Sequence, residues 1–398
     1  MSPASTTAAP PQTLTMQGIA VPASSVNPAE FFRRTRRLRF KNTTAATIQG
    51  FGNTDSFTLR QTGIIAALSV KVFGTLTVAL NAGTCASTAR WPYDLIKRLR
   101  VSANGQSNLV NASGAKLRAR EFMAVGDLTD RGVPQGIGGA SPGTSTPQGT
   151  LSMASEAWGV GQNVTAIPSS TPDVELHYIV PLAWDNVKLL GAIFAQTAST
   201  QLEVDIDWAP VTDLFTLTGA ATVTQAFSVI IEPIAFSIPE VGGQIVVPDL
   251  SVFHSIIQSN DFTPGSNVES EINLQGQGVG RQLMRVYWQL WNGAAPQAPL
   301  ALTAANFPGN LGWRYGGNDT PEVYADGRVL RMSNEKLFST DLGAQGFAVL
   351  DFASQWAFRD SVDEGTATNL RLVINAAALT TPRLEIVQET IFAGATGA

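Results

Sequence analysis

The sequence runs twice through the same ordered series of short β-rich segments, and this internal repeat restricts the fold more than any other feature. The first series opens with Asp55-Ser-Phe-Thr-Leu-Arg and Leu68-Ser-Val-Lys-Val-Phe, and the second with Val268-Glu-Ser-Glu-Ile-Asn and Leu283-Met-Arg-Val-Tyr-Trp. The later segments pair in the same order: Leu99–Gln106 with Gly312–Asp319, Glu175–Ala183 with Phe347–Ala353, Gln201–Ile206 with Asn369–Ile374, and Thr224–Pro233 with Thr381–Thr390. A preserved order at low identity indicates one duplicated architecture. We predict two copies joined near Ile238–Gly243.

The pattern inside each copy favours a particular β fold. Glu203, Asp205 and Asp207 alternate with apolar residues, which is typical of a half-buried strand. Each copy holds about eight such strands, and the 40–45-residue period of a propeller is missing. Even sets of antiparallel strands with long crossovers indicate jelly rolls. We predict an all-β chain of two consecutive eight-stranded jelly-roll β-sandwiches, with few short helices, at Gly114–Val125 and Asn186–Gln196.

This reading divides the chain into three parts. Residues 1–40 are predicted to be a flexible N-terminal arm, because the first 30 are rich in Ser, Thr, Ala and Pro. Residues 41–242 are expected to form the first jelly roll and residues 243–398 the second. A Gly-, Ser-, Thr- and Pro-rich excursion at 126–172 is too long for a simple connection, so we expect a functional surface loop there.

Charge is scarce and unevenly distributed. Only 14% of the 398 residues are charged, against about 25% in a typical soluble domain, so exposed faces must be neutral or covered by other chains. Yet six of the 26 basic residues fall in one short stretch: Arg33, Arg34, Arg36, Arg37, Arg39 and Lys41. Such a cluster can neutralise phosphates of nucleic acid or of lipid head groups. Alternatively, these cations pair with acids of the body.

Few residues could support catalysis or a cofactor. Cys85 is the only cysteine, and the two histidines, His177 and His254, lie in no nucleophile motif. We expect both histidines to be satisfied structurally, and we predict no enzyme and no cofactor. Glu203, Asp205 and Asp207 are weak candidates for Ca²⁺ ligands; the alternative is a solvated or intersubunit polar face. Residues 1–30 lack the basic region of a secretory signal, and no segment has the pattern of a bilayer helix.

The duplication and several short segments of the sequence resemble those of a known family. They are Thr58–Gly63, Val70–Val78, Pro92–Gly105 and Ala226–Pro233, and the order of segments matches over residues 40–398. The resemblance is to double jelly-roll major capsid proteins of tectivirus-like, internal-membrane phages, the lineage that includes the adenovirus hexon.

That resemblance implies a structural virion protein, assembled in the host cytoplasm. Homotrimers would form pseudo-hexagonal capsomers that tile an icosahedral shell beside neighbouring capsomers. Arg33–Lys41 would face inward, toward inner membrane lipids or the genome, and residues 126–172 would form a tower or trimer-locking loop. Minor capsid or vertex proteins are further expected partners, and no catalytic residues carry over.

Three other functions would leave different features in the sequence. A vertex, spike or receptor-binding virion protein would share the sandwiches but should carry a fibre repeat or a sugar site. A jelly-roll carbohydrate-binding protein or glycan-active enzyme needs converging carboxylates, and only Glu203–Asp207 offers candidates. The capsid fold of tailed phages needs a long spine helix, and no amphipathic run of that length is present.

Overall fold

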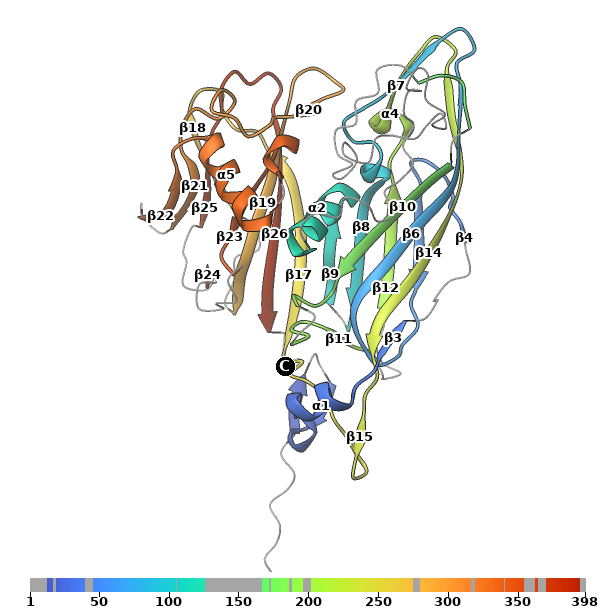
Figure 1. The fold of residues 1–398 in the computed structure, drawn as a ribbon, viewed down its shortest axis with the longest axis vertical. Helices are drawn as coiled ribbons and strands as arrows, with labels where there is room; N and C mark the ends of the chain where they lie inside the picture. Colours follow the sequence, from blue (N-terminus) through green and yellow to red (C-terminus); the bar gives the residue numbers. More distant parts are fainter. Residues whose placement is uncertain are drawn as a thin grey trace, which may run out of the picture.

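The computed structural model shows two β-sandwiches side by side (Figure 1). It describes residues 13–16, 19–39, 46–104, 106–125, 167–171, 173–185, 188–195, 202–274, 280–315, 319–339, 341–353, 362–363 and 370–393. The predicted excursion at 126–172 lies outside the described residues except for 167–171. None of the helices in these ranges is long and apolar enough to cross a membrane.

The main strands of each sandwich form two facing sets of four, in the same order in both sandwiches. In the first sandwich, one sheet runs β5 (Thr54–Thr58), β12 (Leu202–Trp208), β8 (Ile96–Ala103), β9 (Gln106–Ala112), and the other runs β10 (Asp173–Pro181), β6 (Ile64–Ala79), β14 (Thr222–Phe236), β3 (Arg37–Arg39). In the second, the sheets run β18 (Glu269–Asn273), β25 (Arg371–Asn375), β21 (Leu311–Tyr315), β22 (Asp319–Tyr324), and β23 (Phe347–Asp351), β19 (Arg281–Asn292), β26 (Arg383–Ala393), β17 (Val252–Phe262). One set of each sandwich belongs to a ten-stranded sheet that continues from β17 to β9. The one-to-one correspondence of the strands confirms the predicted duplication and the double jelly-roll class.

Alternation of apolar residues builds a core inside each sandwich. In β12, Leu202, Val204 and Ile206 are buried, whereas Glu203 is exposed. The second sandwich has its own core, with Trp288, Leu330 and Leu372 among its members. The core of the first sandwich extends into the second sandwich, where it includes Tyr287 and Val387. The two sandwiches are therefore packed together.

A parallel strand pair also joins the two sandwiches. Ile256 of β17 pairs with Val110 of β9, and Ile257 pairs with Asn111. The connection between the halves runs through a hairpin of β15 (Glu240–Val241) and β16 (Gln244–Ile245). Its two turn glycines, Gly242 and Gly243, both have positive φ, which glycine adopts without steric cost. The remaining short strands are β1 (Thr13–Met16), β2 (Ile19–Pro22), β4 (Ala46–Thr47), β7 (Thr84–Ser87), β11 (Ile193–Phe194), β13 (Phe215–Thr218), β20 (Ala298–Pro299) and β24 (Val362–Asp363).

The helices partly match the prediction. Helix α2 (Gly114–Val125) has the predicted bounds. The helix predicted at Asn186–Gln196 is wrong, because residues 188–195 form a turn and β11. At Gly191, with φ of +82°, an added Cβ would lie 2.5 Å from the Cβ of His254, so only glycine fits this turn.

Helix α5 (Gly327–Phe338) was not predicted. Its N-terminus is capped by Asp326, whose side chain accepts a hydrogen bond from the Val329 amide, and Leu330, Asn334 and Phe338 are buried at helical spacing. Shorter helical segments are α1 (Pro28–Arg34), α4 (Val211–Leu214), η1 (Ala23–Ser25), η2 (Tyr93–Leu95) and η3 (Gly343–Gln345).

Residues 19–39 differ from the prediction of a flexible arm. Asn27 caps α1, and Phe31 of this helix is completely buried. Phe31 belongs to a small core with residues of the first sandwich and of the connection, including Ile64 and Val247. β3 then pairs with the end of β14. The chain is ordered here because it covers apolar residues at one end of the molecule (Figure 1).

Candidate functional site

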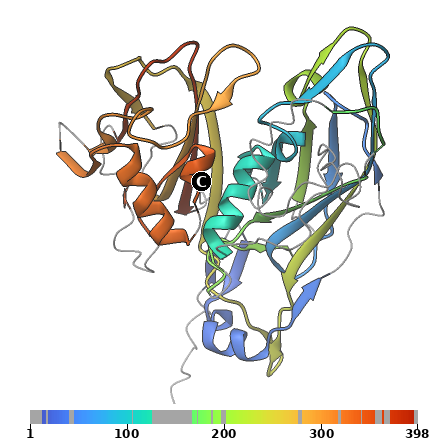
Figure 2. The ribbon, with the colours of Figure 1, turned by 45° about the horizontal axis from the view of Figure 1, so that its top comes forward.

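The most unusual feature of the described chain is a set of buried charges between the two sandwiches, which we call the charged joint. Helix α2 lies there (Figures 1 and 2). It carries Lys116, Arg118 and Arg120, and all three are buried. Lys116 and Arg120 contact the outer face of the β23–β19–β26–β17 sheet, which carries the carboxylates of Glu385 and Glu389, whereas Arg118 pairs with Glu121 of its own helix.

Glu385 is the centre of one ionic cluster. Its carboxylate lies 2.9 Å from the Lys116 ammonium and accepts a 2.7 Å hydrogen bond from Arg90. Arg90 also donates to Asp94, at 2.8 Å, and its guanidinium lies 4.0 Å from the centroid of the Trp291 ring. Lys116 additionally donates to the side-chain oxygen of Gln289.

Glu389 is the centre of a second cluster. Its carboxylate accepts hydrogen bonds from Arg120, at 3.0 Å, and from Arg285, at 3.2 Å. Nε2 of His254 lies 2.9 Å from the same carboxylate. Arg285 pairs in turn with Asp351, at 2.6 Å. His254 is thus held in a structural contact through Nε2, although its buried Nδ1 has no hydrogen-bond partner among the described residues. Nε2 of His177 lies 2.8 Å from the Ser69 hydroxyl, as expected for a structural histidine.

Burial and neighbouring charges set the protonation of both clusters. Burial alone would raise the pKa of Glu385, but Lys116 and Arg90 outweigh it and hold the pKa well below its usual range. Burial would also raise the pKa of Glu389, but Arg120 and Arg285 outweigh burial and hold that pKa well below its usual range. Burial lowers the pKa of His254 below its ordinary value, in spite of Glu389. The joint therefore holds ionised carboxylates and a neutral histidine at pH 7.

The charged joint is a structural device. Buried ion pairs give little net stability over apolar packing, yet removing one partner is strongly destabilising. The contacts consequently favour one placement of α2 against the second sandwich over any alternative. Sequence reasoning missed this site, since Arg90 and Glu385 are 295 positions apart. The available signal was two glutamates four positions apart in one strand, Glu385 and Glu389, and two cations at the same spacing on one helix, Lys116 and Arg120.

The predicted acidic candidates do not form a metal site among the described residues. Asp205 accepts a 2.6 Å hydrogen bond from Ser56. Asp207 accepts from Thr54, at 2.7 Å, and from Arg100, at 3.1 Å. No group of three or more histidine, cysteine or acidic side chains in the described ranges is arranged to hold a metal ion. These contacts support the alternative interpretation, in which the acidic side chains of β12 form a polar face.

The basic stretch lies at the end of the molecule opposite the β7 and β20 loops (Figure 1). The side chains of Arg33 and Arg34 are 80% and 55% exposed, and both pair with Glu30. Arg36 and Arg37 are exposed as well, whereas the side chain of Arg39 and all of Lys41 lie outside the described residues. Exposed Leu14, Phe32 and Ile245 belong to the same end. This end thus combines cations with apolar groups.

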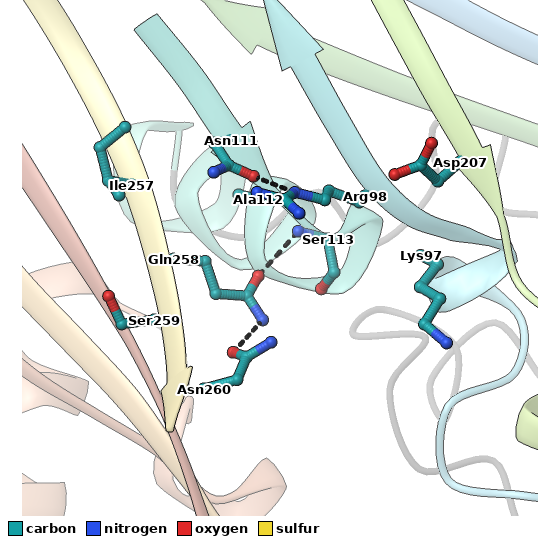
Figure 3. Close-up of a pocket in the computed structure, with 10 residues that line it drawn as sticks. All are labelled: Lys97, Arg98, Asn111, Ala112, Ser113, Asp207, Ile257, Gln258, Ser259 and Asn260. Atoms are coloured by element: carbon teal, nitrogen blue, oxygen red, sulfur yellow. Dashed lines mark hydrogen bonds between the residues drawn. The ribbon is translucent and has the colours of Figure 1, made fainter. Parts of the chain in front are cut away.

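A polar groove of about 490 Å³ follows the parallel strand pair (Figure 3). One hydrogen bond crosses it from the first sandwich to the second: the side chain of Gln258 accepts a 2.7 Å hydrogen bond from the backbone amide of Ser113. Within β17, Gln258 also donates to Asn260, at 2.8 Å. The groove contains no histidine or cysteine among its lining residues. Burial also raises the pKa of the Cys85 thiol to about 11, so that thiol is not a nucleophile at neutral pH. None of these features is a catalytic arrangement.

Comparison of the fold with solved structures gives consistent results. The major capsid protein of STIV superposes with a TM-score of 0.63 at 13% identity, covering 90% of this chain and 97% of that one. A chain of the Sulfolobus turreted icosahedral virus structure gives the same TM-score at 12% identity, with 90% and 91% covered. The PBCV-1 virus capsid gives 0.50 at 11% identity, with 92% and 96% covered. No protein-family model and no curated protein sequence matches this chain.

These similarities define the class of fold. The chain has the double jelly-roll fold of viral major capsid proteins over nearly its whole length. At this level of identity the comparison shows the fold, and the functional conclusion is drawn below.

Proposed function

We propose that this chain is the major capsid protein of an icosahedral virus. The observation that carries the proposal is the match of both sandwiches together, since 90% of this chain aligns with 97% of the STIV major capsid protein. The low charge content supports it, because the cores of intersubunit interfaces are depleted in charged residues. The proposed role is structural.

The proposal includes finer statements from the sequence. Homotrimers would form pseudo-hexagonal capsomers, and residues 41–242 and 243–398 would be the two jelly rolls of each subunit. The site of action would be the virion, after assembly in the host cytoplasm. Neighbouring capsomers, and minor capsid or vertex proteins, would contact this chain in the shell.

Sedimentation and electron microscopy test this function. The purified protein should sediment as a trimer, and particles from the native source should contain hundreds of copies in a hexagonal array. A few copies per particle, at vertices only, would favour a spike or vertex protein instead. A stable monomer that hydrolyses glycans would contradict the proposal.

The basic end is proposed to face the interior of the shell. Its exposed cations and apolar side chains suit contact with anionic lipid head groups or with the genome. We expect the variant with Arg33, Arg34, Arg36 and Arg37 replaced by Gln to form trimers with unchanged thermal stability but to yield at least tenfold fewer closed shells. Sedimentation and particle counts measure both.

A matched control is the replacement of four exposed cations on other parts of the surface: Arg60, Lys97, Arg98 and Lys188. This control carries the same change in net charge and should assemble like the unmodified protein. Loss of folded trimers in the first variant would show that the basic stretch serves folding instead.

A further inference from the structure

The two ionic clusters of the charged joint are built alike but differ in their chemistry. Each joins a cation of α2 to a glutamate of β26 and to the residue of β19 that lies directly across from that glutamate. The members are Arg120, Glu389 and Arg285 in one cluster, and Lys116, Glu385 and Gln289 in the other. A guanidinium is not deprotonated in proteins, whereas a lysine amine can act as a nucleophile. The second cluster therefore places a nucleophile beside a carboxamide, which is an electrophile.

The surroundings of Lys116 favour its neutral, nucleophilic form. Its side chain is completely buried, which is rare for lysine. Nζ lies 5.0 Å from the centroid of the Phe347 ring and 5.8 Å from that of Trp291, and both rings are completely buried. Burial lowers the pKa of Lys116 below its ordinary value, in spite of Glu385. A desolvated lysine of this kind is activated for attack on a carbonyl carbon.

Gln289 is held with its carboxamide against this amine. Nζ of Lys116 donates a hydrogen bond to Oε1 of Gln289. Nε2 of Gln289 donates in turn to the backbone carbonyl of Gln345, at 2.9 Å. The side chain of Gln289 is completely buried, so water does not compete for its carbonyl carbon. Two reacting groups held in contact in this way can react as if present at about 10⁵–10⁸ M.

Glu385 lies where the reaction needs a proton carrier. It is the direct cross-strand neighbour of Gln289, and such a pair projects its side chains from the same face of the sheet. One carboxylate oxygen of Glu385 lies 2.9 Å from Nζ of Lys116, which is within the reach of a general base. A cavity of about 210 Å³, lined in part by Arg90, Asp94 and Glu385, adjoins the cluster and provides space for a small leaving group.

From this arrangement we propose that Lys116 and Gln289 join in an isopeptide bond, with Glu385 carrying the proton. Nζ of the neutral amine forms a bond to Cδ of Gln289, and the carbonyl electron pair moves to Oε1. Glu385 takes a proton from Nζ and passes it to Nε2 of Gln289. The bond between Cδ and Nε2 then breaks, ammonia leaves, the carbonyl re-forms and Glu385 is a carboxylate again. The balance requires no oxidant, reductant or co-reactant.

The bond would tie the two sandwiches together covalently. Lys116 belongs to α2 of the first sandwich and Gln289 to β19 of the second, and they are 173 positions apart in the chain. A covalent tie across the joint would keep the sandwiches in contact when a force pulls one away from the other. This property belongs to the single subunit, so it does not depend on the proposed capsid function.

Mass spectrometry of the full-length protein under denaturing conditions tests the bond. The measured mass should be lower than that of the sequence by one molecule of ammonia. After digestion with a protease, a single branched peptide should contain both Lys116 and Gln289. An intact mass equal to that of the sequence would overturn the proposal. So would a loss of ammonia without the branched peptide, because the loss would then come from another residue.

Substitutions separate the bond from a merely structural ion pair. Lys116→Arg keeps a cation beside Glu385 but removes the nucleophile, and Gln289→Met removes the carboxamide; both variants should have the full mass of their sequences. Lys97→Arg is the matched control, since Lys97 is exposed and pairs with Asp213; it should lose ammonia like the unmodified protein. Loss of ammonia in Lys116→Arg would contradict the assignment of the nucleophile.

Glu385→Gln tests the proton carrier. A positioned acid or base contributes about 10²–10⁴-fold to a rate, so we expect this variant to form the bond at least about 100-fold more slowly. The time course of the branched peptide in freshly made protein measures the rate. A denaturing gel gives a second readout, because a chain closed into a loop migrates faster than the Lys116→Arg chain. Bond formation at an unchanged rate in Glu385→Gln would overturn the role of this carboxylate. If a variant does not fold, the mass of the unmodified protein decides.

Discussion

Replacing Glu389 by Ala is expected to lower the free energy of unfolding by about 3–5 kcal/mol, the usual cost of breaking a buried ion pair from one side. Glu389 is completely buried and neutralises Arg120 and Arg285. Without it, Arg120 keeps only the Trp184 carbonyl as a hydrogen-bond acceptor in the described contacts. Urea unfolding followed by tryptophan fluorescence measures the loss.

Glu203→Ala is the matched control for this variant. Glu203 also lies on a strand, β12, but its side chain is exposed, and surface substitutions usually change stability by less than about 0.5 kcal/mol. A loss below about 1 kcal/mol for Glu389→Ala would contradict the role of the charged joint. Such a small loss would mean that Arg120 is solvated once Glu389 is removed, and so does not depend on this carboxylate.

Acidification is expected to destabilise the subunit in two stages. The lowered pKa of His254 keeps it neutral in the folded state, so the unfolded state binds the extra proton as pH falls below about 6.5. The lowered pKa values of Glu385 and Glu389 contribute stability above about pH 4.3, which is lost as pH falls further. We expect a shallow decrease between pH 7 and 5 and a steeper one below pH 4.5.

Unfolding free energies at pH 7.5, 5.5 and 4.0 measure both stages. One proton taken up on unfolding corresponds to a slope of about 1.4 kcal/mol per pH unit. His254→Asn should remove the first stage and leave the second, whereas Glu385→Gln should reduce the second only. Stability that is constant between pH 7.5 and 4.0 would show that these groups do not titrate with unfolding.

The strand segments could be predicted from sequence because alternation is a local property. Leu202, Val204 and Ile206 mark the buried side of β12 without reference to any other segment. The helix predicted at Gly114–Val125 is observed with the same bounds. The prediction of a helix at Asn186–Gln196 failed because Ile193 and Phe194 pair instead with Ile65 and Ile64 of β6, which are distant in the chain.

The arm was misjudged for a related reason. Its Ser-, Thr- and Pro-rich composition is typical of a mobile segment, but Phe31 packs with Ile64 and Val247. Composition reports how much apolar surface a segment carries, whereas order depends on whether a matching surface exists elsewhere. That surface is assembled only when the connection between the sandwiches folds.

The sequence by itself determined that this protein is a duplicated all-β chain whose surface has too few charges for a subunit standing alone. The tertiary structure alone decided where those charges act. Glu385 and Glu389 are ordinary polar positions in a strand until β26 is packed against α2, where Lys116 and Arg120 meet them. The reason is physical: alternation follows from neighbouring residues, but an ion pair depends on distances across the fold and on the water that burial removes.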